Sequence, residues 1–378
     1  MKHQKNTLFL LLSLFAISVY NTGCNKDSAD QTFVPSGKIV YAASTFNHTT
    51  LYAIDAEVGK KLWEYTVTNP NQPTQIYSSP TVANGFLYVA SYSKRVYALD
   101  ARTGAYKWEY QTGDTLMSTP MVANNVLFIG SGDRKVTALN AATGMLKWSY
   151  TTGGKIYGSP TIANGLVYCG ALDGKVYAND TAKGTLKWSF QTNGMIYSSP
   201  AENNGVVYVG SFDGSLYALN ALTGVKVWSY TTPAFIYSSP TVKDGVVYFG
   251  CFDKKLYAVN TATGSKKWEF PTGGVIGSSP VIDNGIIYFG SYDNKVYAVD
   301  LNGVQKWSFS TNDIVEASPV VVNGTVYITS KDHNVYALDA ATGIQKWSYT
   351  TADIIGASPV VADTSANVWY SGISGHVQ

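Results

Sequence analysis

Residues 200–230 read PAENNGVVYVGSFDGSLYALNALTGVKVWSY, and tight turns divide this stretch into short strands. Asn204-Gly205 fits a type I′ hairpin turn, since both central residues of that turn need a positive φ. Asp213-Gly214 and Thr223-Gly224 mark two further turns. The apolar run 206–210 is typical of a strand that is buried on both faces. The stretch therefore predicts a four-stranded antiparallel sheet whose outer strand carries Trp228.

This motif recurs eight times along the chain. The proline of a Ser-Pro or Thr-Pro pair returns every 40 residues, with one interval of 39, at Pro80, Pro120, Pro160, Pro200, Pro240, Pro280, Pro319 and Pro359. A tryptophan follows nearly the same spacing, at Trp63, Trp108, Trp148, Trp188, Trp228, Trp268, Trp307 and Trp347. A period of about 40 residues with strand-like content is typical of a β-propeller with one blade per repeat. The sequence thus predicts an all-β, eight-bladed propeller of four-stranded antiparallel blades over residues 38–378.

The two ends of the repeat region predict how the ring closes. Residues 39–65 supply a second, a third and a fourth strand, whereas 358–360 supply a first strand. We expect one blade to be completed by both termini, which removes an open sheet edge. Residues 368–370 match a second strand that is then surplus, so 368–378 either displace 39–44 or pack alongside.

Composition excludes several classes of protein. Only 14% of the 378 residues are charged, against roughly 25% in an average soluble protein, which excludes a solvated disordered chain. Lys and Arg number 27 and Asp and Glu 25, so no global field exists that would recruit nucleic acid. Partners must therefore be sought in local patches.

The repeat resembles a known family. Ala53-Ile54-Asp55 with Gly59 and Trp63 follows the Ala-x-Asp-x-x-x-Gly-x-x-x-Trp pattern of the pyrroloquinoline-quinone-type propeller repeat. In that family the Trp of each outer strand docks between adjacent blades, and eight blades are usual. The repeat occurs in quinone-dependent dehydrogenases and in non-enzymatic lipoproteins of the BamB type, which act in outer-membrane β-barrel assembly. A lone propeller behind a leader sequence is more similar to the latter.

The N-terminal residues predict targeting to the cell envelope. Lys2 and Lys5 precede an apolar stretch over 7–20 that is too short to span a bilayer. Gly23-Cys24 resembles the end of the lipobox of bacterial lipoproteins, although Asn21 replaces the usual aliphatic residue, so ordinary signal-peptide cleavage is the alternative. We expect a signal peptide over 1–23, a lipidated Cys24 with a flexible tether over 24–37, and an outer-membrane lipoprotein that faces the periplasm or the cell surface.

Catalytic chemistry has little support in the sequence. Four histidines occur, of which His333 and His48 fall in turns or loops, and no metal-ligand spacing is present. Cys169 and Cys251 sit at offset repeat positions and are expected to be buried thiols without a disulfide. An Asp or Asn ends the third strand of each repeat, at 55, 100, 140, 180, 220, 260, 300 and 339, where its side chain is expected to cap its own turn.

The quinoprotein alternative makes its own demands on the sequence. Dehydrogenases of the resembled family carry a catalytic Asp, a Glu-Asn-Asp set around Ca²⁺ and often adjacent cysteines. Adjacent cysteines are absent here, and Glu316 is the one acid within three residues ahead of a repeat proline. No cofactor is therefore expected, with pyrroloquinoline quinone as the alternative.

A departure from eightfold symmetry marks a candidate binding site. The residue three places ahead of each repeat proline is Tyr77, Met117, Tyr157, Tyr197, Tyr237, Gly277, Glu316 and Gly356 in turn. These positions should encircle one mouth of the axial channel, with bulky residues on one arc and small or acidic residues on the other. Either the tyrosines fill the funnel, or they anchor a docked partner.

A lysine precedes most of the outer-strand tryptophans. The lysines are Lys107, Lys147, Lys187, Lys267, Lys306 and Lys346. They either discourage edge-to-edge pairing or form a basic waist near an anionic membrane.

The function that these observations favour is a non-catalytic, monomeric envelope scaffold. It would bind envelope proteins and carry a lipid anchor. Its specific role would be in the assembly of outer-membrane β-barrel proteins. A quinone-dependent dehydrogenase and a glycan-binding propeller are the alternatives.

Overall fold

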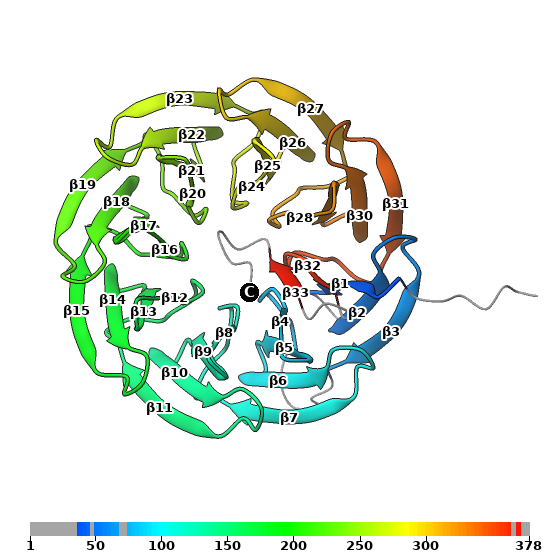
Figure 1. The fold of residues 1–378 in the computed structure, drawn as a ribbon, viewed down its shortest axis with the longest axis horizontal. Helices are drawn as coiled ribbons and strands as arrows, with labels where there is room; N and C mark the ends of the chain where they lie inside the picture. Colours follow the sequence, from blue (N-terminus) through cyan, green and yellow to red (C-terminus); the bar gives the residue numbers. More distant parts are fainter. Residues whose placement is uncertain (1–35, 46–48, 68–73, 364–367, 372–378) are drawn as a thin grey trace, which may run out of the picture. The chain divides into compact units, whose positions relative to one another are not determined.

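The computed structural model describes residues 36–45, 49–67, 74–363 and 368–371, which form a ring of eight antiparallel sheets (Figure 1). Each sheet is one blade, and its strands follow one another from the axis to the rim. The predicted eight-bladed propeller is therefore confirmed. The apolar stretch 7–20, Cys24 and His48 lie outside the described residues.

Within the described ranges, no helix has the length and apolar character needed to cross a membrane.

Seven blades each contain four consecutive strands. The three-residue inner strands are β4 (Thr81–Ala83), β8 (Met121–Ala123), β12 (Thr161–Ala163), β16 (Ala201–Asn203), β20 (Thr241–Lys243), β24 (Val281–Asp283) and β28 (Val320–Val322). The second strands are β5 (Phe86–Ser91), β9 (Val126–Gly130), β13 (Leu166–Gly170), β17 (Val206–Gly210), β21 (Val246–Gly250), β25 (Ile286–Ser291) and β29 (Thr325–Thr329). The third strands are β6 (Arg95–Asp100), β10 (Lys135–Asn140), β14 (Lys175–Asp180), β18 (Ser215–Asn220), β22 (Lys255–Asn260), β26 (Lys295–Asp300) and β30 (Asn334–Asp339). The outer strands are β7 (Tyr106–Gln111), β11 (Leu146–Thr151), β15 (Leu186–Gln191), β19 (Lys226–Thr231), β23 (Lys266–Pro271), β27 (Gln305–Ser310) and β31 (Gln345–Thr350).

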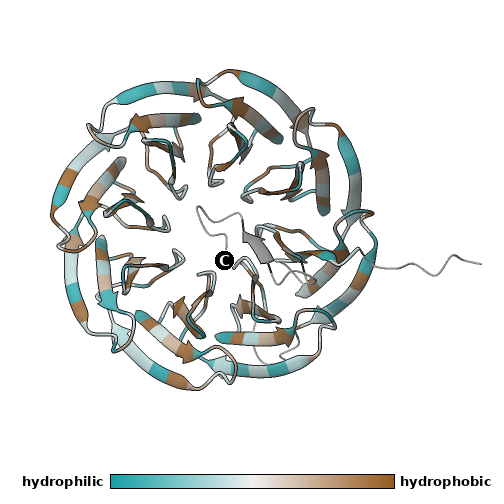
Figure 2. Ribbon diagram, in the orientation of Figure 1, coloured by the Kyte–Doolittle hydropathy of each residue, from teal (hydrophilic) through white to brown (hydrophobic). Residues whose placement is uncertain are grey.

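Turn chemistry sets the strand boundaries as the sequence predicts. Asn204 and Gly205 have φ values of 51° and 78°, the left-handed conformation that a type I′ turn requires. The following strand β17 is almost wholly buried, whereas the outer strand β19 alternates between exposed and half-buried residues. Figure 2 shows the corresponding change from apolar inner strands to mixed outer strands.

Tryptophans join neighbouring blades around the ring. Trp188 of β15 is only 8% exposed, and its indole N–H donates to the Ala221 carbonyl of the next blade at 2.9 Å. Its ring covers Gly224, where an added Cβ would lie 2.6 Å from the indole. Trp347 makes the same contacts with Gly59 and donates to the Ala56 carbonyl at 3.0 Å. Because Trp347 belongs to the last complete blade, this contact closes the ring.

The eighth blade is built from both ends of the propeller and contains five strands. β1 (Lys38–Ala43), β2 (Thr50–Asp55) and β3 (Lys61–Thr66) form its outer part, and β32 (Val360–Asp363) pairs with β1. β33 (Val368–Ser371) pairs with the opposite edge of β32, inside the ring and close to β4 and β28 (Figure 1). The alternative that 368–378 displace 39–44 is therefore wrong, because β1 already satisfies the outer edge of β32. The surplus strand packs alongside, and it takes the one edge of β32 that remained.

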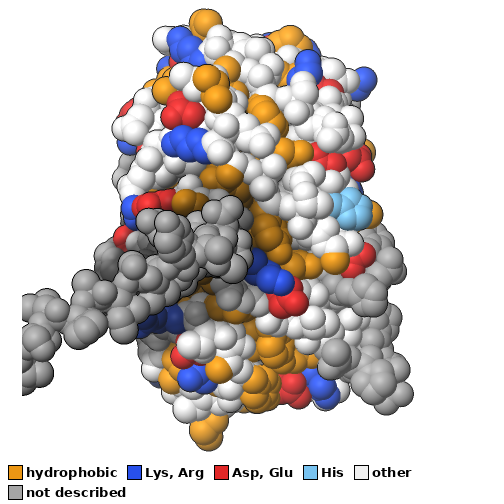
Figure 3. Space-filling model, turned by 90° about the vertical axis from the view of Figure 1, so that its right-hand side faces the viewer, with side chains coloured by type: hydrophobic (Ala, Val, Ile, Leu, Met, Phe, Trp, Pro, Cys, Tyr) orange, Lys and Arg blue, Asp and Glu red, His pale blue; other side chains and the backbone are white. Residues whose placement is uncertain are grey.

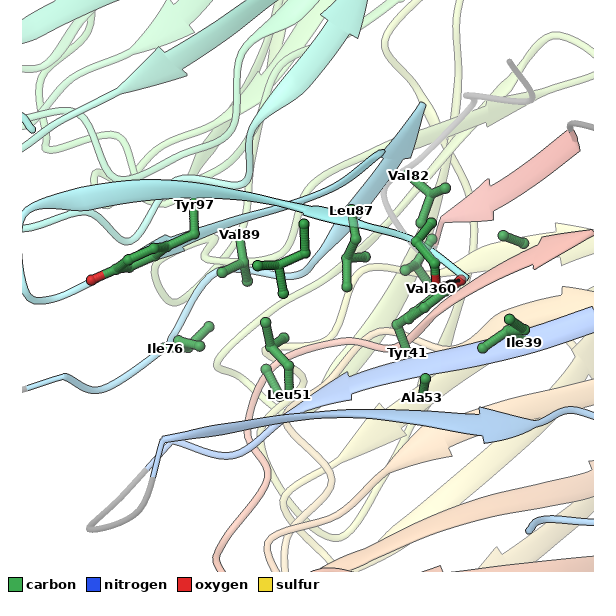
Figure 4. Close-up of a cluster of buried hydrophobic side chains, with 14 of the residues drawn as sticks. Ile39, Tyr41, Leu51, Ala53, Ile76, Val82, Leu87, Val89, Tyr97 and Val360 are labelled. Atoms are coloured by element: carbon green, nitrogen blue, oxygen red, sulfur yellow. Dashed lines mark hydrogen bonds between the residues drawn. The ribbon is translucent and has the colours of Figure 1, made fainter. Parts of the chain in front are cut away.

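Apolar side chains fill the joint between this closing blade and the β4–β7 blade. Tyr41, Leu51 and Val360 of the closing blade meet Leu87 and Tyr97 (Figure 4). The Tyr41 hydroxyl also donates to the Ala101 carbonyl at 2.7 Å. The closing joint is therefore a continuous core.

Candidate functional site

One cavity of about 340 Å³ lies on the propeller axis, because equivalent residues from all eight blades line it. Its lining includes every position of the predicted ring: Tyr77, Met117, Tyr157, Tyr197, Tyr237, Gly277, Glu316 and Gly356. The structure thus brings together the residues that sequence periodicity placed at one mouth. The volume falls within the roughly 300–1,000 Å³ of small-molecule sites.

A ring of hydroxyl side chains lines the same cavity. It consists of the residue ahead of each repeat proline: Ser79, Thr119, Ser159, Ser199, Ser239, Ser279, Ser318 and Ser358. From Ser79 round to Ser358, each backbone N–H donates to the hydroxyl of the next member, over distances of 2.8–3.1 Å. These bonds connect adjacent blades at the axis, so the Ser-Pro and Thr-Pro pairs have a structural role as well as a place in the cavity.

The tyrosines of the bulky arc contact one another. The ring centroids of Tyr157 and Tyr197 are 5.9 Å apart, and those of Tyr197 and Tyr237 are 5.7 Å apart. These three residues lie directly ahead of β12, β16 and β20, on consecutive blades. Each is half-buried, so one part of the side chain packs against the funnel while another part faces the cavity.

A second set of aromatic residues, which the sequence reasoning missed, extends this arc outward. Phe212 stacks on Tyr197 with centroids 4.6 Å apart, and Phe235 lies 4.7 Å from Phe212 and 4.2 Å from Phe252. Phe252 in turn contacts Tyr292 at 6.3 Å. The signal was present, because the residue two places after each second strand's glycine follows the same 40-residue period, with Phe212, Phe252 and Tyr292 at successive repeats.

We call this connected surface the aromatic crescent. It contains Tyr157, Met195, Tyr197, Phe212, Phe235, Tyr237, Phe252 and Tyr292. Met195 and Phe235 are its most open members, at 43% and 37% exposure, and Met195 accepts a backbone hydrogen bond from Phe212. The crescent extends over four of the eight blades, from the loop ahead of β12 to the loop after β25.

The opposite arc of the mouth has two glycines in place of bulky side chains, and it carries the ion pair between Glu316 and Lys331. Lys331 Nζ lies 2.7 Å from Glu316 Oε2, and both side chains are half-buried. Gly277 and Gly356 have no side chain, and a Cβ added to either would meet its nearest neighbours at an ordinary distance of 3.5 Å. The fold does not demand glycine at these two places, and the cavity gains the space.

Three phenols around the mouth have raised pKa values. Burial raises the pKa of Tyr237 to about 12, with further contributions from Glu316 and Tyr197. Burial and the carboxylate of Glu316 also raise the pKa of Tyr292 well above its usual value. The pKa of Tyr77 is raised by burial and by its neighbours Tyr92 and Glu316. The mouth therefore presents phenol hydroxyls that both donate and accept hydrogen bonds.

The other candidates from the sequence have structural roles. Asn220 Oδ1 accepts from the backbone N–H groups of Leu222 and Thr223 at 3.0 Å, and Asp180 makes the same bonds two and three residues on. The predicted capping of turns by this ring is confirmed. Cys169 and Cys251 are buried free thiols, as predicted, and burial raises the pKa of Cys251 to about 11. His333 adopts a φ of 72° in the turn between β29 and β30.

Four of the six predicted outer-strand lysines pair with acids of their own blades. Lys107 lies 3.2 Å from Asp100, and Lys306 lies 2.8 Å from Asp300. Lys187 and Lys346 pair in the same way with Asp180 and Asp339. Basic and acidic side chains accordingly intermix on the side of the ring (Figure 3). Pairing reduces the positive field that a basic waist would need.

Among the described residues, no group of three or more His, Cys, Asp or Glu side chains is arranged to hold a metal ion. The mouth offers hydroxyls, phenols and the Glu316–Lys331 pair as polar groups. This arrangement can bind and orient a ligand through hydrogen bonds and aromatic contact.

Two family models match the chain. The model described as "Beta-alanine-activating enzyme, beta-propeller" matches residues 28–245, and that described as "Outer membrane protein assembly factor BamB" matches residues 194–308 and 270–373. No curated protein matches significantly.

Two solved structures share the fold. BamB from Moraxella catarrhalis is similar with a TM-score of 0.68 and 18% identity, over 80% of this chain and 98% of that one. The computationally designed Ika8 protein gives a TM-score of 0.69 and 14% identity, over 81% and 96% of the two chains. At these identities the likeness shows the fold alone.

Fold and site together define a closed eight-bladed propeller with an axial cavity. The model described as "Beta-alanine-activating enzyme, beta-propeller" matches more than half of the chain, so the chain belongs to this family of β-propellers. The model described as "Outer membrane protein assembly factor BamB" matches the C-terminal part of the same ring. The match to the BamB model and the shared fold confirm the resemblance predicted from the repeat motif.

Proposed function

We propose that this propeller is a non-catalytic binding scaffold of the bacterial cell envelope that docks a protein partner on the aromatic crescent. The observation that carries the proposal is the contact chain from Tyr157 to Tyr292, which forms on one half of an otherwise regular ring. Aromatic side chains offer large contact areas with few rotors to immobilise, and they dominate the binding energy of many interfaces. Mutual stacking fixes these rings before a partner arrives, which lowers the entropy cost of docking.

The polar groups at the mouth support a binding role rather than catalysis. Hydroxyl nucleophiles need an adjacent base, but the serines of the cavity accept backbone N–H groups from the preceding blade. Glu316 is engaged with Lys331 at 2.7 Å. Pyrroloquinoline quinone carries three carboxyl groups, and a single lysine that is already paired is a poor match for them. We therefore propose that the protein acts without this cofactor.

The docking proposal is tested with a paired substitution on the crescent. Replacing Met195 and Phe235 by Ser should weaken capture of the envelope partner roughly tenfold or more, because interface anchors of this kind contribute about 2 kcal/mol or more. Both side chains are substantially exposed, so thermal stability should hardly change. Chemical cross-linking in the native envelope followed by affinity capture and mass spectrometry measures the loss.

A matched control lies on the outer rim of the β16–β19 blade. Leu222 and Val225 are 67% and 65% exposed, and replacing both by Ser removes a similar apolar area from a different surface. This control should retain full capture. Equal capture by the crescent variant and the wild type would contradict the docking proposal.

A lipid anchor at Cys24 is the second part of the proposal, and the lipobox-like Gly23-Cys24 supports it. Cys24→Ala should move the protein from the membrane fraction to the soluble fraction and abolish labelling by an alkyne-tagged fatty acid. Unaltered fractionation and labelling would mean that the chain is held in the envelope in another way, or not at all.

The finer role that we propose is assistance in the assembly of outer-membrane β-barrel proteins. The matching family description and the similarity to BamB support it. Loss of the protein should lower the amounts of folded barrel proteins in the outer membrane, and the crescent variant should fail to restore them. Normal barrel levels without the protein would refute this role while leaving the docking proposal intact.

A further inference from the structure

We propose that the axial cavity, which the crescent residues Tyr157, Tyr197 and Tyr237 help to line, binds the end of a neutral saccharide as a ligand separate from the protein partner. The cavity of about 340 Å³ is within the range of small-molecule sites and suits a mono- or disaccharide. The proposal depends on four properties of the lining: its hydroxyl ring, its phenols, its balance of charge and its two glycines.

The hydroxyl ring presents donors toward the axis from every blade. Ser159, Ser199 and Ser239 each accept a backbone N–H from the preceding blade, at 2.9–3.1 Å. A hydroxyl has one donor and two acceptor sites, so a group that already accepts retains its own proton for a ligand oxygen. Ligands with many closely spaced oxygens match such a ring.

The wall above the hydroxyls combines apolar ring surface with hydrogen-bonding phenols. Tyr77, Tyr157, Tyr197 and Tyr237 all line the bulky arc of this wall. The phenols of Tyr77, Tyr197 and Tyr237 are protonated at neutral pH, and burial raises their pKa values further, so they donate as well as accept. A pyranose ring has the complementary character, with C–H groups on its faces and hydroxyls around its edge.

Charge favours a neutral ligand over an ionic one. Among the lining residues, the charged pair is Glu316 with Lys331, whose charges oppose each other at 2.7 Å. An anionic or cationic ligand would lose water without meeting an uncompensated opposite charge, which is costly. Sugar hydroxyls can still use the remaining acceptor sites of the carboxylate and the remaining donors of the ammonium group.

Gly277 and Gly356 leave open the space that a ligand would need. An added Cβ at Gly356 would have Thr45 at 3.5 Å and Lys331 at 3.9 Å as its nearest neighbours, so packing alone does not require glycine. Four blades carry Tyr at this position, which shows that the propeller accommodates a large side chain there. Gly356→Tyr is therefore expected to fold and to fill part of the cavity.

The test measures binding of three neutral disaccharides to the purified propeller by saturation-transfer NMR and titration calorimetry. The probes are cellobiose, maltose and N,N′-diacetylchitobiose, and glucose 6-phosphate serves as a charged comparison. We expect at least one neutral probe to bind and glucose 6-phosphate to bind more weakly. Gly356→Tyr should weaken the binding roughly tenfold or more, since it displaces the ligand and its hydrogen bonds.

Two control variants separate this inference from the proposed docking function. Ile344→Tyr adds the same side chain at a rim position that is 68% exposed, and it should leave saccharide binding unchanged. The Met195 and Phe235 double variant should lose the protein partner but retain the saccharide. If this double variant loses partner capture while the wild-type protein binds none of the sugars, the saccharide site is overturned and the docking function is preserved.

Other outcomes would also overturn the inference. One is saccharide binding that survives in Gly356→Tyr. Another is tighter binding of glucose 6-phosphate than of every neutral probe. A third is that Gly356→Tyr loses partner capture although the wild-type protein binds no probe. The last result would mean that a side chain of the protein partner fills the cavity.

Discussion

Replacing Trp188 by Ala should lower the free energy of unfolding by about 3–5 kcal/mol, because a large aromatic side chain leaves a cavity between two packed blades. Trp188 contacts Tyr168 in its own blade at a centroid distance of 5.8 Å, covers Gly224, and donates to Ala221. Denaturant unfolding followed by fluorescence and circular dichroism measures the change. A loss below about 1 kcal/mol would refute the docking role of this residue.

Trp63 provides an internal control for the hydrogen bond. It lies over Gly104 as Trp188 lies over Gly224, yet within the described residues its buried indole N–H has no hydrogen-bond partner. Trp188→Phe should therefore cost about 0.5–1.5 kcal/mol more than Trp63→Phe, since only the former loses a hydrogen bond. Equal costs would mean that the indole N–H contributes little to the joint.

Gly224→Ala should lower the free energy of unfolding by about 2–4 kcal/mol, through two separable effects. Its φ of +71° is unfavourable for a residue with a Cβ, and that Cβ would lie 2.6 Å from the Trp188 ring. Gly205→Ala in the same blade isolates the first effect, because its φ is +78° and no heavy atom lies within 4 Å of the added Cβ. The difference between the two variants, measured by denaturant unfolding, gives the cost of displacing the tryptophan. If both variants lose the same stability, the indole moves aside freely and the blade joint is softer than the contacts indicate.

Local chemistry and long-range period made most of the fold predictable from the sequence. Asn204-Gly205 specifies its turn without help from the rest of the chain, and the spacing of the tryptophans specifies how many such units follow. The position of β33 was not predictable, because residues 368–370 have the sequence of a second strand and such a strand can pair with either edge of β32. Only the prior pairing of β32 with β1 decides between the two edges.

The candidate site was predictable in part for the same reason. Periodicity placed Tyr157, Tyr197 and Tyr237 at one mouth, since equivalent positions in a ring lie at equivalent heights. Phe212 and Phe235 come from different loops of neighbouring blades, and their contact depends on how those loops approach in space. The Glu316–Lys331 ion pair likewise joins two loops of the β28–β31 blade, the loop ahead of β28 and the turn between β29 and β30, and it has no local sequence signature.

Closure of the eighth blade by β32 has a consequence for folding during synthesis. The Trp347 indole bonds to Ala56 across 291 residues of sequence, and Thr45 bonds to Ile354 across 309. While the chain emerges from the ribosome, β1 has an unpaired edge until nearly all of the protein has been made, and contacts of such long range form slowly. An exposed strand edge invites pairing with other chains. We therefore expect a nascent chain to be open to edge-to-edge pairing with other chains until its last blade closes.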